Sequence, residues 1–159
     1  MNNPPIDNTL LSPRNLRFLY LYRDASNYKQ HGEAVFSNRD RLSLKEIEER
    51  IRAHLRDGEF FIARQVCLDE FFFDALYEDD HPWHEFHFVE ATTDPPFDPA
   101  CWRERGQRRD IATFLFELEA AHRAGWDEMN VREDLKQQMN RQKQEWKRSL
   151  QNGQQPLQP

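Results

Sequence analysis

The chain has 159 residues, a formal net charge of −6 and a hydrophobic content of 38%, which predict one compact domain with polar extensions and argue against two separate cores. Its two cysteines, Cys67 and Cys101, are too few and too distant for a disulfide scaffold or a cysteine-rich zinc site. The sequence has no secretory signal and no apolar stretch of about eighteen residues, so we expect a cytoplasmic protein without a membrane span.

Acidic residues are concentrated in the middle of the chain. Residues 57–98 contain twelve Asp and Glu and a single basic residue, Arg64, so their local charge is −11. The segments before and after them carry +3 and +2. The negative net charge disfavours nonspecific binding to nucleic acid, whereas the acidic middle favours a partner protein with a basic surface.

The first half of the chain predicts a hairpin. Residues 1–15 are rich in Pro and Asn without hydrophobic periodicity, which indicates a flexible lead-in. Residues 17–22 are apolar on both faces, as in a central strand, and residues 32–37 predict a second strand. The connection between them, residues 23–31, is longer than the common two to five residues of a hairpin loop.

A helix is predicted from Ser43 to Asp57. Ser43 and Glu46 match a capping box, apolar residues recur every three or four positions after it, and Gly58 is suited to end it. Residues 59–63 predict a third strand. The phenylalanine-rich stretch 66–77 fits neither helix nor strand periodicity, so it is expected to be a short helix or irregular.

Residues 83–90 predict a fourth strand, with alternate residues on opposite faces. One face would carry Trp83, Glu85, His87 and Val89, and the other His84, Phe86, Phe88 and Glu90. The alternative is a helix that begins near Asp80 with Pro82 in its first turn.

Two helices are predicted after a proline-rich connector. The first spans residues 107–123, and the second spans 127–150 and is polar apart from a narrow apolar seam that includes Trp146. So narrow a seam buries too little area to stabilise an isolated helix, which therefore needs its own domain or a partner. The sequence thus predicts an α+β domain over 16–125, a long polar helix over 126–150 and a disordered tail over 151–159. Its sheet would be small, mostly antiparallel, three- or four-stranded and covered by the first helix.

Three of the six histidines lie close together beside carboxylates, which suggests a divalent metal site. The candidate ligands are Asp80, His81, His84 and His87. Neither a strand nor a helix presents all three histidines on one face, so such a site would need a turn at Pro82. The alternative is a solvated acidic edge with one histidine packed under an aromatic side chain, and no cofactor. Nearby carboxylates are expected to favour the charged imidazoles, with pKa values near or above about 6.5.

The hairpin connection supplies further candidate binding residues. Its guanidinium, ammonium, amide and phenol groups suit phosphate, carboxylate or a base edge. The predicted binding residues are Arg23, Asp24, Asn27, Tyr28, Lys29 and Glu33, together with Trp83, Glu85 and Trp146. The structural alternative is that Asp24, Ser26 and Asn27 satisfy the backbone of the turn, while Arg23 pairs with a carboxylate.

Three segments carry a resemblance to known proteins. They are Tyr-Arg-Asp-Ala-Ser-Asn-Tyr-Lys at 22–29, Asp-Gly-Glu-Phe-Phe-Ile at 57–62 and Asp-Asp-His-Pro-Trp-His-Glu-Phe at 79–86. They resemble a group of small bacterial proteins of unknown function, over roughly residues 17–91. The resemblance implies a bacterial, single-domain, intracellular protein and brings no activity, cofactor or catalytic residue. The C-terminal helices lie outside it.

The sequence therefore favours a small accessory or protein-interaction protein that uses its acidic middle and the Trp146 seam. One alternative is a metal-dependent hydrolase or nuclease built on the Asp and His cluster at 79–87, and another is a nucleic-acid-associated factor or DNA mimic. The enzyme requires the 23–33 connection and the 78–87 cluster to share one cleft. We assign no catalytic residue, and self-association through the C-terminal helix is compatible with the sequence.

Overall fold

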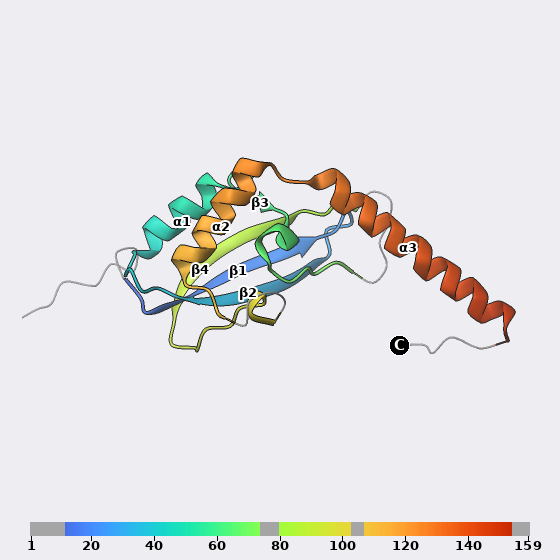
Figure 1. Cartoon of the computed structure of the whole chain (residues 1–159), viewed down its shortest axis with the longest axis horizontal. Helices are drawn as coiled ribbons and strands as arrows, with labels where there is room; N and C mark the ends of the chain where they lie inside the picture. The colour runs from blue at the N-terminus through green and yellow to red at the C-terminus, as the bar shows by residue number, and fades with distance from the viewer. Residues whose placement is uncertain (1–11, 74–79, 103–106, 154–159) are drawn as a thin grey trace, which may run out of the picture.

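The structure is a computed structural model of the chain, and it describes residues 12–73, 80–102 and 107–153 (Figure 1). The elements are β1 (Asn15–Arg23), β2 (Lys29–Ser37), α1 (Leu44–Ala53), β3 (Phe60–Phe61), the 3₁₀ helix η2 (Ala63–Val66), β4 (His84–Thr92), α2 (Ile111–Ala124) and α3 (Glu128–Gln151). The described strands form one antiparallel sheet in the order β2-β1-β4-β3. The predicted α+β class and small antiparallel sheet are confirmed. In the described part of the chain, no helix is long and apolar enough to cross a membrane.

The hairpin of β1 and β2 is tighter than predicted. Its pairing runs from Asn15 with Ser37 to Arg23 with Lys29, so the connection has only residues 24–28. The prediction of a nine-residue loop was wrong, because residues 29–31 continue the backbone pairing of β2 with β1 although their side chains are polar. Ordered contacts also begin before residue 16, since the Pro13 carbonyl accepts a hydrogen bond from the side-chain amide of Asn38 (2.9 Å).

Helix α1 begins as predicted and ends earlier. The Ser43 hydroxyl accepts from the Glu46 amide (3.1 Å), which confirms the N-cap. The helix ends at Ala53 because the chain turns back sharply at Asp57 and Gly58, which both have positive φ (54° and 70°). An Asp-Gly pair tolerates this conformation, and the turn brings Phe60 beside Arg56.

Residues 84–92 form strand β4, which confirms the predicted strand over the alternative helix. One extra residue within it, however, reverses the predicted facing of the residues that follow. Tyr20 pairs with Phe86 and the adjacent Leu19 pairs with Phe88, so His87 is the extra residue of a β-bulge. A bulge resets the alternation of side chains. Val89 therefore packs against the same core as Phe86, which corrects the predicted faces beyond His87.

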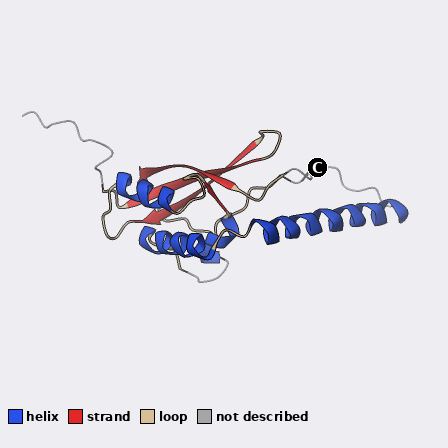
Figure 2. Cartoon of the chain, turned by 90° about the horizontal axis from the view of Figure 1, so that it is seen from above, coloured by secondary structure: helices blue, strands red, loops and turns tan. Residues whose placement is uncertain are grey.

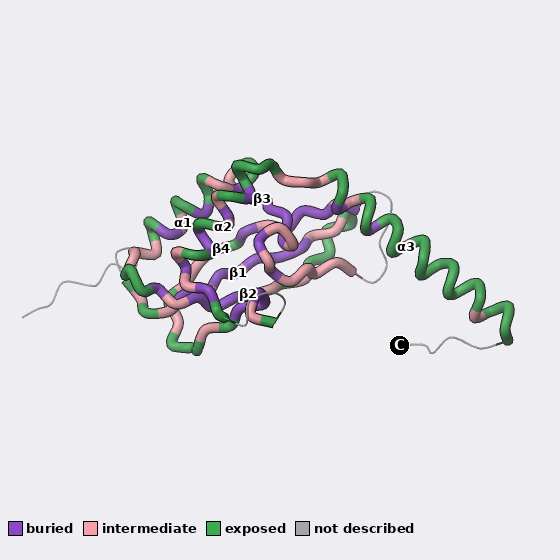
Figure 3. Tube along the Cα trace, in the orientation of Figure 1, coloured by how far each residue is buried: buried purple, intermediate pink, exposed green. Residues whose placement is uncertain are grey.

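The main core combines strand residues with buried residues of α1 and α2. Figure 2 shows the helices and strands by type, and Figure 3 shows which stretches of the chain are buried. In Figure 1, α1 and α2 lie on the same side of the sheet. Phe114 of α2 stacks on Phe36 of β2 with ring centroids 4.6 Å apart, and Ile47 and Ile51 of α1 are fully buried. Helix α2 starts at Ile111, four residues later than predicted, because Asp110 caps it through the Ala112 amide (3.0 Å).

Candidate functional site

The turn between β1 and β2 is held by its own side chains. One Asp24 carboxylate oxygen accepts from the amides of Ser26 (3.0 Å) and Tyr28 (2.8 Å). Asn27 adopts a positive φ of 69°, which its short polar side chain tolerates. The predicted binding residues Asp24 and Asn27 thus maintain the turn, while Tyr28 is exposed and lies at its edge.

This turn is tied to the segment that precedes β4. The Arg23 guanidinium contacts Glu85 (2.9 Å) and Asn27, and an Asp80 carboxylate oxygen accepts from the Ala25 amide (3.0 Å). The structure therefore brings residues 22–29 and 80–86 together, as neighbouring strands allow. The contacts themselves are those of a structural junction.

Tyr22 and His81 form the next layer of this junction. The buried Tyr22 hydroxyl donates to the His81 carbonyl (2.8 Å), and the His81 Nδ1 accepts from the Trp83 amide (3.1 Å). Burial, followed by the charges of Asp80 and Asp24, raises the pKa of Tyr22. Tyr22 therefore stays protonated and acts as a donor that fixes the path of the chain at His81.

His84 lies inside the core. Its Nε2 accepts from the Phe71 amide (3.0 Å), so the proton of the neutral ring belongs on Nδ1, which has no well-aligned partner among the described residues. Burial lowers the pKa of His84 to about 3; the Pro82 carbonyl opposes this shift and the neighbouring His81 adds to it. The expected rise in histidine pKa is wrong for His84, because burial disfavours the charged imidazole.

The four predicted metal ligands do not converge. Asp80 contacts the hairpin turn, His84 faces the core, and the exposed His87 sits in the bulge with its ring 4.5 Å from that of Phe88. Across residues 12–73, 80–102 and 107–153, no group of three or more His, Cys, Asp or Glu side chains is arranged to hold a metal ion.

A shallow cleft of about 330 Å³ lies beside this junction. It is lined by Arg56, Asp57, Phe60, His81, Trp83 and Glu128. The Arg56 guanidinium lies over the Trp83 ring at 4.9 Å and 3.6 Å from Glu128, so that cation already has an aromatic and an acidic partner. Residues 23–33 do not line the cleft, and the convergence in one cleft that an enzyme would require is absent from its described lining.

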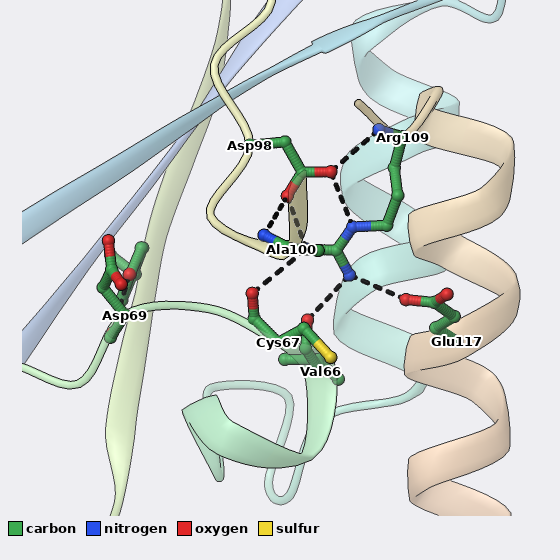
Figure 4. Close-up of polar contacts among 8 residues, drawn as sticks. Val66, Cys67, Asp69, Asp98, Ala100, Arg109 and Glu117 are labelled. Atoms are coloured by element: carbon green, nitrogen blue, oxygen red, sulfur yellow. Dashed lines mark hydrogen bonds and ion pairs between the residues drawn. The ribbon is translucent and has the colours of Figure 1, made fainter. Parts of the chain in front are cut away.

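The most buried ion pair among the described residues was not predicted (Figure 4). Arg109 contacts Asp98 through two nitrogens (2.8 and 2.9 Å) and Glu117 (2.7 Å), and donates to the Val66 carbonyl (2.7 Å). Burial alone would raise the pKa of Asp98, but the hydrogen bonds and charge of Arg109 outweigh it and lower that pKa. No local sequence pattern links Arg109 to Asp98, eleven residues away.

The acidic middle is largely neutralised in space. Nine of its carboxylates are described, and five pair with arginines: Glu70 with Arg64, Glu85 with Arg23, Glu90 and Asp94 with Arg17, and Asp98 with Arg109. Arg17 also pairs with Glu33 (3.0 Å), which places that predicted binding residue in a surface ion network. Three of these four arginines, Arg17, Arg23 and Arg109, lie outside the acidic stretch in the sequence. The described part of the stretch therefore does not form a continuous acidic face.

Helix α3 has two distinct parts. Its first turns are anchored by Val131 and Leu135, which pack with Ile62 and Trp83 in a second core cluster, and by an ion pair of Asp134 with Arg64 (2.9 Å). We call residues 136–151 the arm. The arm extends away from the sheet (Figures 1 and 3) for about 24 Å at 1.5 Å per residue.

The arm leaves large apolar side chains in solvent. Trp146 is 54% exposed and Leu150 is 55% exposed, and their spacing of four residues places them on one face. Within the described residues, no arm residue belongs to either core cluster. Of the predicted binding residues, Trp83 is thus buried in the second cluster, Lys29 is an exposed strand residue, and Trp146 is accessible.

Comparison of the chain with protein-family models, curated proteins and solved structures found no match. The candidate site is therefore defined by geometry alone. It comprises two features of different kinds, the cleft beside Trp83 and the exposed face of the arm.

Proposed function

We propose that this chain is a small protein-interaction protein whose contact element is the arm. The observation that carries the proposal is the exposure of Trp146 and Leu150 on one face of a helix that projects from the domain. A polar helix of this length gains little stability in water by itself. A partner that covers the Trp146 face would supply the missing packing.

The pattern of ion pairs supports the arm over the acidic middle as the contact element. Most described carboxylates of residues 57–98 have arginine partners within the same chain, which reduces their attraction for an external cation. Asp57 and Glu59 have no ion pair among the described residues and lie near the cleft, so an acidic contact with a basic partner would centre on this turn.

The resemblance to small bacterial proteins fits a domain that presents a separate contact element. Its three segments adjoin at one end of the sheet through the Arg23–Glu85 and Tyr22–His81 contacts and the pairing of Phe60 with Glu85. This arrangement supports the interpretation that they form one structural unit. The arm lies outside that unit and would give this chain its own partner.

Site-specific photo-cross-linking tests the proposal. A photoreactive amino acid replaces Leu150 in the full chain, and the same amino acid at exposed Glu49 of α1 is the control. We expect a discrete protein adduct in the native cell from position 150 that disappears when Trp146→Ala is added. Equal adducts from both positions, or none from position 150, would contradict the arm as the contact element.

A further inference from the structure

The arm has the opposite charge to the rest of the chain. It carries five basic residues and one acidic residue, a net charge of +4, so the remaining residues carry −10. The basic residues are Lys136, Arg141, Lys143, Lys147 and Arg148, and the acidic one is Glu145. No ion pair within the described residues involves them, in contrast to Arg17, Arg64 and Arg109 of the domain. Their charge is therefore available to a partner.

The lysines of the arm border its apolar stripe. At about 100° per residue, Lys136, Lys143 and Lys147 fall within about 40° of one another, next to the stripe of Met139, Trp146 and Leu150. Met139 and Lys143, with Lys136 and Asn140, also line a shallow groove of about 390 Å³ on this face. Apolar and cationic groups thus form adjacent parallel rows along one helix.

We propose that the arm docks as a helix into an apolar groove bordered by Asp and Glu on another protein. This inference rests on the proposed function and names the class of partner. An amphipathic helix binds such a groove through apolar side chains at helical spacing. Tryptophan, the residue at position 146, is among the residue types that contribute most binding energy at the centre of protein interfaces. The lysine row meets the acidic border, which directs the helix and speeds association.

The lysine row and the apolar stripe also argue against three other kinds of binding partner for the arm. Two arms side by side would bring +4 against +4, which opposes a second copy. Three large apolar residues over four turns make a stripe too narrow to cover a lipid surface, where a broad apolar face is buried. Nucleic acid requires the basic residues but leaves the Trp146 stripe without a role.

The test uses the full chain and a defined probe, a labelled helical peptide of about four heptads with Leu at a and d and Glu at e and g. The matched probe has Lys in place of Glu. We expect salt-sensitive binding of the Glu peptide in fluorescence anisotropy, and weaker binding by about tenfold or more for Trp146→Ala and for the triple variant Lys136→Glu, Lys143→Glu and Lys147→Glu. Trp102→Ala, another exposed tryptophan, should bind as the unmodified chain does.

Several outcomes would overturn the inference. Equal binding of the Lys peptide, or unchanged binding of the Glu peptide by the arm variants, would contradict a partner groove bordered by acidic residues. Tighter binding to phosphatidylserine vesicles or to a single-stranded oligonucleotide would assign the lysines to those ligands, and a dimer dissociated by Trp146→Ala would assign the stripe to a second copy. Any of these with a persisting adduct at position 150 leaves the proposed function intact, whereas loss of that adduct removes both.

Discussion

The domain and the arm use charged side chains in opposite ways. In the domain, arginines such as Arg17 and Arg109 are paired with carboxylates brought from distant parts of the chain. In the arm, the basic residues form no ion pair with the described residues, and the apolar residues Trp146 and Leu150 stay in solvent. The difference teaches that a run of like charges in the sequence predicts a binding surface only where the fold leaves those charges without ion-pair partners.

Removal of Arg109 should give the largest effect. Arg109→Met leaves Asp98 fully buried without its cation, and loss of one partner of a buried pair typically costs about 3–5 kcal/mol. The free energy of unfolding, measured in urea, should fall by this amount. Arg141→Met in the arm is the matched control and should change it by less than about 0.5 kcal/mol. Similar losses in both variants would contradict the difference between the two regions.

A pH dependence should separate two histidines of the domain. The pKa of His84 is about 3 when folded and about 6.5 in an unfolded chain, so between these values the unfolded state binds the extra proton. The contribution of neutral His84 to the free energy of unfolding is fully present above about pH 6.5. It is lost as the pH falls, by up to about 1.4 kcal/mol per pH unit.

Urea unfolding between about pH 6.5 and pH 4.5 measures this slope, in a window above the ordinary pKa of carboxyl groups. His84→Gln should make the slope shallower, and the same substitution at exposed His87 should leave it unchanged. A slope that His84→Gln does not alter would mean that another group carries the acid sensitivity.

Local patterns predicted much of the fold and little of the site. The Ser43 cap, the strands before Arg23 and after Trp83 and the polar C-terminal helix each depend on neighbouring residues, so periodicity and capping rules identify them. The Arg109–Asp98 pair and the bulge at His87 depend on which strands and loops meet in space. A single sequence contains no signal for such meetings, and hence the acidic stretch was interpreted as a face.

The sequence also grouped residues that the fold separates. His81 and His84 lie three positions apart, yet one lines the cleft and the other is fully buried in the core. For the C-terminal helix, the sequence left open whether the seam packs on its own domain or on a partner. The structure divides it, because Leu135 packs in the second core cluster and Trp146 is exposed.

The smallest effect tests where the domain ends and the arm begins. Leu135 and Leu150 lie on the same helix, but Leu135 is 7% exposed and packs with Ile62 and Trp83. Leu135→Ala should therefore lower the free energy of unfolding by about 2 kcal/mol, since it removes buried methyl groups from a peripheral cluster. Leu150→Ala should change it by less than about 0.5 kcal/mol, because that side chain is already in solvent. Thermal unfolding of both variants checks the contrast, and a destabilised Leu150→Ala would place the arm within the folding unit and leave its apolar stripe without a free face for a partner.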